Sequence, residues 1–271
     1  MTQMPPGASR KRTMTHVRKI KRSGRGSLTL VLVVCLFVSS CKKAEPVDHA
    51  AEGLTLASKG QYDEAISEFT KGLEANPDSE ILYGNRALAH FHKGEYDRAI
   101  ADYSKAIELN PRYHEAHFDR GNAYRARGDD DRAIADYGRA IEMNPAYAAA
   151  YYNRGISYEQ KGEFNLAIAD YTSAIGISET YPGAYCNRGR AYARKEQYEQ
   201  AMQDWTKAIE INPSAPEPYI NRAVVNFARA AYDESWRDVN KAQSLGAQLP
   251  PDFLEQLRKA SGGESRPTRR W

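Results

Sequence analysis

Small and large apolar residues follow one pattern that returns every 34 residues between residues 46 and 249. When the proline of each Asn-Pro pair is numbered position 32, positions 8, 20 and 27 carry Gly, Ala or Ser in all six copies. Positions 17 and 24 carry mostly aromatic residues. Small side chains at fixed points let two helices approach to roughly 8 to 10 Å, and the aromatic side chains fill the space beside them. The pattern therefore predicts two packed helices in each copy and a stack of six copies.

The turns agree with this interpretation. Glycine recurs at position 15, where the first helix of a copy must end, and glycine adopts the left-handed backbone at low cost. These glycines are Gly60, Gly94, Gly128 and Gly162. Proline at position 32 then ends the second helix in four of the copies. The sixth copy departs most from the pattern, with Ala230 in place of the glycine and Val239 in place of an aromatic residue, as is common in a terminal repeat.

These residues resemble the tetratricopeptide repeat, a helix-turn-helix family defined by small residues at fixed offsets. The resemblance implies an all-α, right-handed superhelix of six repeats. The expected repeats span residues 46–79, 80–113, 114–147, 148–181, 182–215 and 216–249. After them, Phe253, Leu254 and Leu257 predict a short amphipathic helix within residues 250–260 that caps the open end, and residues 261–271 are expected to form a disordered basic tail.

Acidic and basic residues also recur at fixed positions. Position 23 is acidic in every repeat, and position 7 is arginine in repeats two to six but Glu52 in repeat one. Pairing within a repeat would place Glu52 against Glu68. We therefore predict that each acid pairs with the arginine of the next repeat, in a partly buried contact between neighbours. The predicted pairs are Glu68–Arg86, Asp102–Arg120, Asp136–Arg154, Asp170–Arg188 and Asp204–Arg222.

The first forty residues differ in character from the rest. They carry eight Lys and Arg and no acid, and an apolar run occupies residues 28–38. A basic segment before about ten apolar residues is typical of a secretory signal, whereas a membrane-spanning helix needs about 20. An uncleaved anchor is the alternative, and translation can start at Met1 or at Met14.

The residues that close this segment, Val-Ser-Ser-Cys at 38–41, resemble the bacterial lipobox. The resemblance implies that residues 1–40 are removed as a signal peptide and that Cys41 becomes the lipidated first residue, on a short tether over 41–45. Cys35 is a poorer candidate because the bulky Val34 precedes it. Lys42 stands where the inner-membrane retention signal of bacterial lipoproteins has aspartate, which favours the outer membrane facing the periplasm. In the alternative, Cys41 is unmodified.

Removal of residues 1–40 changes the sign of the net charge. The whole chain has 38 basic and 35 acidic residues, a net charge of +3. Because eight basic residues are lost, residues 41–271 retain 30 basic and 35 acidic residues, a net charge of −5. This balance argues against nucleic acid as a partner.

A candidate binding surface follows from helical geometry. Positions 2, 6, 9 and 13 of the first helix share one face, separate from the packing positions, and stacking turns these faces into a concave groove. Position 6 is mostly asparagine, which can donate to and accept from a peptide backbone. The predicted ladder is Asn85, Asp119, Asn153, Asn187 and Asn221, and the groove residues predicted around it are Phe91, Phe118, Tyr152, Arg125, Arg190 and Arg194. The ladder resembles the asparagine ladder of the peptide O-GlcNAc transferases, which implies binding of an extended peptide.

Three alternatives compete with a peptide groove. The carboxylate clamp of the Hsp70 and Hsp90 co-chaperones also uses an asparagine, but its basic residues are missing at position 2. The asparagines can instead bridge neighbouring helices. A metal site at His90, His92, His114 and His117 would need ligands at metal spacing, and the H-E-x-H run does not match the zinc-protease motif.

Taken together, these observations predict a non-catalytic scaffold of the bacterial envelope. It would bind partner proteins or extended peptides in the groove, with no cofactor, no metal and no small-molecule substrate. A chaperone-like or regulatory module for exported polypeptides is the second class, and a metal-dependent enzyme is the third. The oligomeric state and the identity of the partners stay open.

Overall fold

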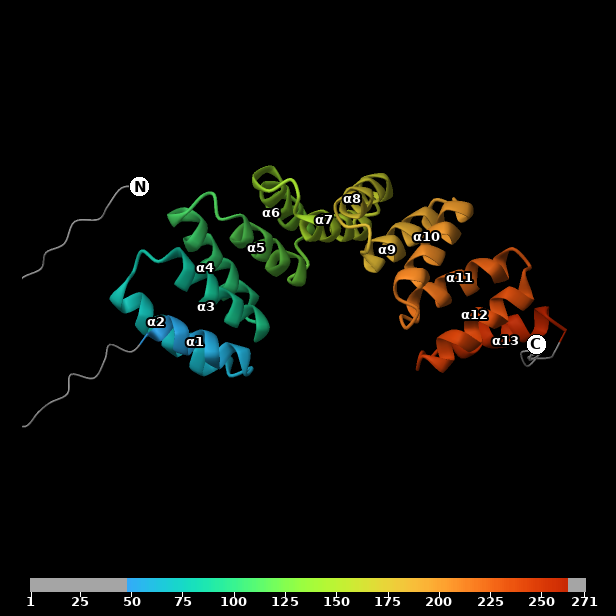
Figure 1. Cartoon of the computed structure of the whole chain (residues 1–271), viewed down its shortest axis with the longest axis horizontal. Helices are drawn as coiled ribbons and strands as arrows, with labels where there is room; N and C mark the ends of the chain where they lie inside the picture. The colour runs from blue at the N-terminus through green and yellow to red at the C-terminus, as the bar shows by residue number, and fades with distance from the viewer. Residues whose placement is uncertain (1–47, 263–271) are drawn as a thin grey trace, which may run out of the picture. The chain divides into compact units, whose positions relative to one another are not determined.

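The computed structural model describes residues 48–262, and this part of the chain consists of helices without a strand (Figure 1). The predicted signal peptide, Cys41 and most of the basic tail lie outside the described residues. The helices are α1 (His49–Ser58), α2 (Tyr62–Ala75), α3 (Glu80–His92), α4 (Tyr96–Leu109), α5 (His114–Ala126), α6 (Asp130–Met143), α7 (Ala148–Gln160), α8 (Phe164–Ile177), α9 (Pro182–Arg194), α10 (Tyr198–Ile211), α11 (Glu217–Ala228), α12 (Tyr232–Ser244) and α13 (Pro251–Ala260). The first twelve form six successive antiparallel pairs, one in each predicted repeat.

The core runs along the middle of the stack, where the two helices of each pair meet. The aromatic residue at position 24 is almost completely buried in repeats one to five: Phe69, Tyr103, Tyr137, Tyr171 and Trp205. Position 8 of the facing helix is small because the ring lies directly against it. A Cβ atom added to Gly155 would lie 2.7 Å from Cε1 of Tyr171, and one added to Gly189 would lie 2.7 Å from Nε1 of Trp205. The small and aromatic positions of the sequence therefore form complementary halves of one contact.

The turns have the geometry that the sequence predicts. Gly94 and Gly128 at position 15 have φ of +76° and +85°. Repeats five and six lack this glycine, and Glu196 and Ala230 adopt φ of 61° and 59° in its place. A left-handed residue with a Cβ atom costs roughly 1 to 2 kcal/mol. The fifth and sixth repeats are therefore held in the same turn at a greater cost in free energy.

Helix α13 covers the C-terminal end of the stack. Leu257 is fully buried in a cluster with Trp236 and Val239 of α12, and Phe253 and Leu254 pack against the same cluster. The Trp236 indole Nε1 donates a hydrogen bond to Ser261 Oγ at 3.0 Å, just beyond the end of α13. This short helix therefore removes from solvent the apolar surface that a seventh repeat would otherwise cover.

The predicted register of the acid–arginine pairs is wrong. Each arginine at position 7 binds the acid at position 23 of its own repeat, through two short hydrogen bonds. The observed pairs are Arg86–Asp102, Arg120–Asp136, Arg154–Asp170, Arg188–Asp204 and Arg222–Asp238, with N–O distances of 2.7 or 2.8 Å. Glu68 of repeat one binds His49 Nδ1 at 2.7 Å and Lys71 Nζ at 2.5 Å instead. The repulsion between Glu52 and Glu68 that motivated the prediction is thus relieved locally.

The arginines also contact the preceding repeat, but through a hydroxyl group. Arg86 Nη1 donates to Thr70 Oγ1 at 3.1 Å, and Arg188 Nη1 donates to Thr172 Oγ1 at 3.0 Å. Position 25, which supplies this hydroxyl, is Gly138 before Arg154. Arg154 therefore depends on Asp170 alone for its side-chain hydrogen bonds within the described residues.

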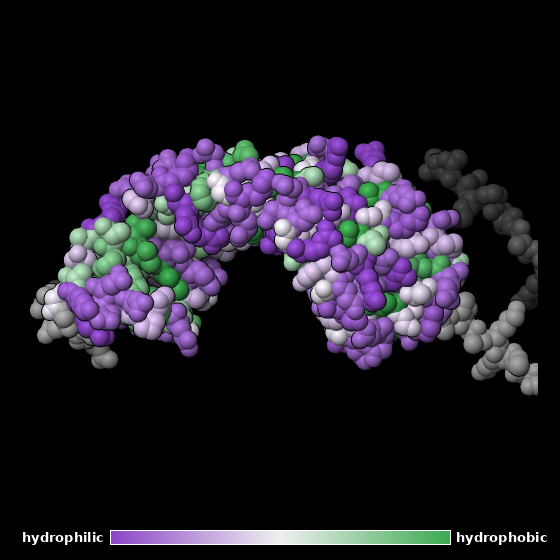
Figure 2. All heavy atoms as spheres, turned by 180° about the vertical axis from the view of Figure 1, so that it is seen from behind, coloured by the Kyte–Doolittle hydropathy of each residue, from purple (hydrophilic) through white to green (hydrophobic). Residues whose placement is uncertain are grey.

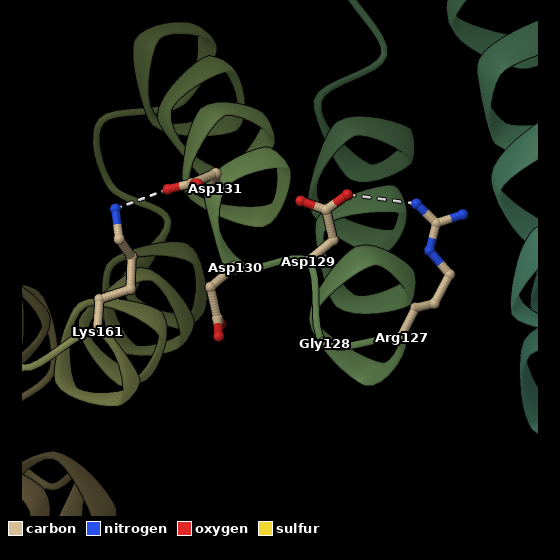
Figure 3. Close-up of a pocket in the computed structure, with 6 residues that line it drawn as sticks. All are labelled: Arg127, Gly128, Asp129, Asp130, Asp131 and Lys161. Carbon is tan, nitrogen blue, oxygen red and sulfur yellow. Dashed lines mark hydrogen bonds and ion pairs between the residues drawn. The ribbon is translucent and has the colours of Figure 1, made fainter.

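A second set of charged contacts joins successive repeats at the edge where the turns lie. A basic residue at position 14 reaches the residue at position 18 of the preceding repeat. Arg127 Nη1 lies 2.6 Å from Asp97 Oδ1, and Lys161 Nζ lies 2.6 Å from Asp131 Oδ1. Figure 3 shows the Lys161–Asp131 pair and, across a shallow pocket at this edge, Arg127 and Asp129. These pairs are largely exposed, so each contributes at most about 1 kcal/mol.

Candidate functional site

The first helix of each repeat lies on the inner side of an arc. Figure 1 shows α5, α7 and α9 inside α6, α8 and α10, and Figure 2 shows the hollow under the arc from the opposite side. Positions 2, 6, 9 and 13 of these inner helices fall on the face away from the packing positions. We call the residues at these four positions the inner stripe.

The asparagines of the predicted ladder contact the preceding repeat. Asn153 Nδ2 donates to Asn122 Oδ1 at 2.8 Å, and Asn187 Nδ2 donates to the Tyr152 hydroxyl at 3.1 Å. Asn221 Nδ2 lies 3.7 Å from Cys186 Sγ. One donor of each amide thus bridges two repeats, as the second interpretation of these residues expected. Among the described residues, the three Oδ1 atoms accept no hydrogen bond, and Asn85 makes none through its side chain.

Asp119 occupies the third place in the ladder and has a different environment. Burial and, to a smaller extent, the negative charge of Glu115 raise the pKa of its carboxyl group to about 6. A hydrogen bond from Asn122 Nδ2, at 3.4 Å, is too long to offset this cost. The carboxyl group therefore gains a proton at a pH where ordinary aspartate is fully ionised.

The three arginines predicted for the groove differ in whether a side chain of the protein already binds their guanidinium group. Arg190 donates two hydrogen bonds to Glu159, at 2.6 and 3.1 Å, and so is neutralised within the stripe. Arg125 Nε donates to the Tyr137 hydroxyl at 3.3 Å. Arg194 is exposed and forms no ion pair within residues 48–262. Arg194 is consequently better placed than Arg190 to meet an acidic residue.

The predicted aromatic residues form part of the floor of the groove. Phe118 packs against Tyr147 with ring centroids 4.8 Å apart, and Tyr152 packs against Tyr181 at the same distance. Phe91 packs against Tyr96 at 5.6 Å. These rings are only partly exposed and pack within their own repeats, so a ligand would reach only part of their surface.

Aliphatic residues, which the sequence reasoning did not select, provide the exposed apolar surface. Six large apolar residues within 48–262 are at least 40% exposed, and four of them belong to the inner stripe. Those four are Leu54, Ile81, Leu88 and Val224. The sequence could have predicted this apolar surface, because position 9 is aliphatic in four of the repeats: Leu54, Leu88, Ile156 and Val224. Soluble proteins rarely gather exposed apolar residues on one face unless that face binds a partner.

The histidines are engaged in local contacts. His90 Nδ1 lies 2.6 Å from Glu95, and His117 Nδ1 lies 3.4 Å from Asp136. His92 stacks on Tyr62 with ring centroids 5.1 Å apart. Within the described residues, no three His, Cys, Asp or Glu side chains are arranged to hold a metal ion.

Family models match most of the stack. Models described as "TPR repeat" match residues 89–125 and 121–162, and models described as "Tetratricopeptide repeat" match residues 50–79, 148–181 and 182–215. The protein belongs to the tetratricopeptide-repeat family. The six pairs α1 to α12 are thus tetratricopeptide repeats, and the all-α solenoid predicted from the sequence is confirmed. No curated protein matches the sequence.

Solved structures of other tetratricopeptide-repeat proteins have the same fold. The crystal structure of MamA is 30% identical, with a TM-score of 0.57, over 59% of this chain and 94% of MamA. YrrB, described as "a TPR protein with an unusual peptide-binding site", is 22% identical with a TM-score of 0.58, over 71% of this chain and 97% of YrrB. A repeat protein of Cytophaga hutchinsonii is 25% identical with a TM-score of 0.63, over 78% of this chain and 84% of that one.

Proposed function

We propose that this protein is a non-catalytic scaffold that binds an extended segment of a partner protein along its inner stripe. The observation that carries the proposal is that Leu54, Ile81 and Leu88 are exposed on this face of repeats one and two, with Val224 exposed at position 9 of repeat six. Burial of one such side chain contributes about 1.5 to 3 kcal/mol to binding. Asn85 and Asn221 lie on the same helices as Leu88 and Val224, and their Oδ1 atoms can accept from a peptide backbone, which gives affinity without strict sequence requirements.

Replacement of Leu88 by aspartate is expected to weaken partner binding by about ten- to a hundredfold, because it removes apolar contact and places a charge in the groove. Leu166→Asp is the matched control, since Leu166 is 48% exposed and Leu88 is 42% exposed, but Leu166 lies on α8 outside the inner stripe. A photo-cross-linking amino acid placed at either position in living cells would identify the captured proteins. Equal capture from both positions would contradict a groove.

The same proposal places the scaffold in the bacterial envelope, held by acyl chains on Cys41. It rests on the lipobox-like residues 38–41 and on the basic and apolar segment before them. No helix within residues 48–262 is long and apolar enough to cross a bilayer. Two or more acyl chains at about 0.8 kcal/mol per buried methylene would make the attachment stable. Lys42 favours the outer membrane in a bacterium with two membranes.

The Cys41→Ser variant is expected to incorporate no labelled palmitate and to leave the outer-membrane fraction. Cys35→Ser is the control and should be labelled and sorted like the parent protein, because Cys35 lies inside the segment that is removed. Labelling and membrane fractionation in a two-membrane bacterium measure both outcomes. Persistent label on Cys41→Ser would rule out this anchor, and sedimentation with the inner membrane would rule out the proposed location.

A further inference from the structure

Asp119 is an ionisable carboxyl group in a partly buried site that lacks a basic partner. The five aspartates at position 23 are also buried, and each is held by two hydrogen bonds from an arginine. Glu159, the other shielded acid of the inner stripe region, is held by Arg190. Asp119 forms no ion pair with any residue of 48–262, and its hydrogen-bond donor is a neutral amide. The ionised form of a carboxyl group in this setting is less stable than in water, and a cation that reaches it from outside would stabilise it.

The Tyr103 hydroxyl, in the preceding repeat, has no hydrogen-bond partner. Tyr103 is 2% exposed, and its buried hydroxyl makes no hydrogen bond. The equivalent hydroxyls do have partners, since Tyr137 donates to Asn122 at 2.9 Å and Tyr171 donates to Glu159 at 2.9 Å. A buried hydroxyl that gives up water without a hydrogen bond costs about 1 to 3 kcal/mol. The junction between repeats two and three thus holds a buried hydroxyl group without a hydrogen bond and a carboxyl group without a basic partner.

The repeat register places these two groups next to each other. The Tyr137 hydroxyl bonds to Asn122, which in turn accepts from Asn153 at position 6 of the following repeat. One repeat earlier, Tyr103 and Asp119 occupy the places of Tyr137 and Asn153, and Leu88 occupies the place of Asn122, so the amide that would join the two groups is missing. In agreement, Asp119 is the charged group that most raises the pKa of Tyr103.

The surroundings of Asp119 are acidic, aromatic and apolar. Its influence also raises the pKa values of three further tyrosines, on α6 and in the turns that precede α5 and α7. The titratable and charged groups around it are Tyr103 of α4, Tyr113 before α5, Glu115 and Arg125 of α5, Tyr137 of α6 and Tyr147 before α7. Arg125 is directed to the Tyr137 hydroxyl. On the preceding inner helix, Ile81 and Leu88 are exposed beside this junction.

We propose that the junction of repeats two and three is a subsite for a basic side chain of the bound peptide, flanked by an apolar residue that packs on Leu88 and Ile81. The ammonium or guanidinium group binds the Asp119 carboxylate from the groove, and Tyr103 donates to the same carboxylate from beneath. The bound cation replaces the missing counter-ion, and the ionised carboxylate supplies the acceptor that the hydroxyl lacks. This subsite rests on the proposed function, because it assigns one residue of the same ligand.

The subsite can be tested by phage display. Random twelve-residue peptides are selected for binding to the full-length protein extracted from membranes. Peptides selected on the parent protein should be enriched in Lys or Arg next to an apolar residue. Asp119→Asn restores the amide found in repeats two, four, five and six and should abolish the basic enrichment while leaving the apolar preference. Glu142→Gln removes an exposed acid of α6, outside the inner stripe, and should keep the enrichment.

Each outcome separates the two proposals. Enrichment of apolar peptides without basic residues overturns the subsite and leaves the scaffold function standing. An absence of any enriched peptide overturns the scaffold function and the subsite with it. Equal loss of basic residues in Asp119→Asn and Glu142→Gln also overturns the subsite, because it would reflect the general negative charge of the protein.

The pH dependence of one selected basic peptide gives a readout that a purely structural role of Asp119 would not produce. Its affinity for the parent protein should fall about tenfold per pH unit below about 6, as Asp119 gains its proton. Asp119→Asn should bind about ten- to a hundredfold more weakly at pH 7.5 and show no such fall. Tyr103→Phe keeps the packing of the ring and should bind about three- to tenfold more weakly. An unchanged affinity in both variants would overturn the proposal.

Discussion

Replacement of Asp170 by alanine is expected to lower the free energy of unfolding by about 3 kcal/mol. Arg154 is only 21% exposed at its side chain, and Asp170 is 7% exposed, so the change leaves a guanidinium group shielded from water without an acceptor. Arg154 has no alternative partner because Gly138 stands where other repeats provide a hydroxyl group. Contacts with the Tyr151 and Tyr158 rings, at 5.7 and 5.9 Å, retain part of its stabilisation.

Asp204→Ala provides the comparison, because Arg188 keeps its hydrogen bond to Thr172. The loss in free energy of unfolding should be about 1 kcal/mol smaller for Asp204→Ala than for Asp170→Ala. Urea denaturation followed by far-ultraviolet circular dichroism measures both values. A double-mutant cycle should give a coupling energy above about 1.5 kcal/mol for Arg154 with Asp170 and below about 0.5 kcal/mol for Arg154 with Asp136. The reverse order would restore the pairing between repeats that the sequence suggested.

Substitution of Gly155 by valine should destabilise the stack by a similar amount, about 3 kcal/mol. The first added carbon would lie 2.7 Å from the Tyr171 ring, which is fully buried and has no space into which to move. Alanine at this position should cost less, because Ala87 occupies the equivalent place opposite Tyr103 in repeat two. The substitution forces α7 away from α8, so the loss comes from the packing of the whole helix pair.

Gly176→Val on α8 is the matched control for this prediction. A Cβ atom at Gly176 would have no neighbour within 4 Å. The free energy of unfolding of this variant should therefore lie within about 0.5 kcal/mol of that of the parent protein. Thermal and urea denaturation of the three variants gives the order directly. A Gly155→Val protein as stable as Gly176→Val would show that the two helices are not held at the close distance described above.

The sequence was sufficient to predict the helix pairs, because packing within a repeat depends on residue size at fixed positions. Gly155 and Tyr171 are one example, and the left-handed Gly94 and Gly128 are another. The partners of the charged residues were harder to predict, since acidic and basic residues recur at several positions of the repeat. Glu68 pairs with His49 and Lys71, and a prediction based on positions 7 and 23 alone did not consider these two residues.

The groove was predicted only in part for the same reason. The position of the asparagines on the inner face follows from helical periodicity. Their hydrogen bonds depend on the distance between repeats, which places Asn122 within reach of Asn153 and the Tyr152 hydroxyl within reach of Asn187. The unpaired state of Asp119 depends on residues from three successive helices, and no single repeat contains that information.

Each helix pair of the stack contacts chiefly the pairs before and after it. Small changes in the angle between neighbouring repeats therefore add up along the chain, so the solenoid can bend as a whole. The groove can widen or narrow for partners of different diameter while each local contact changes very little.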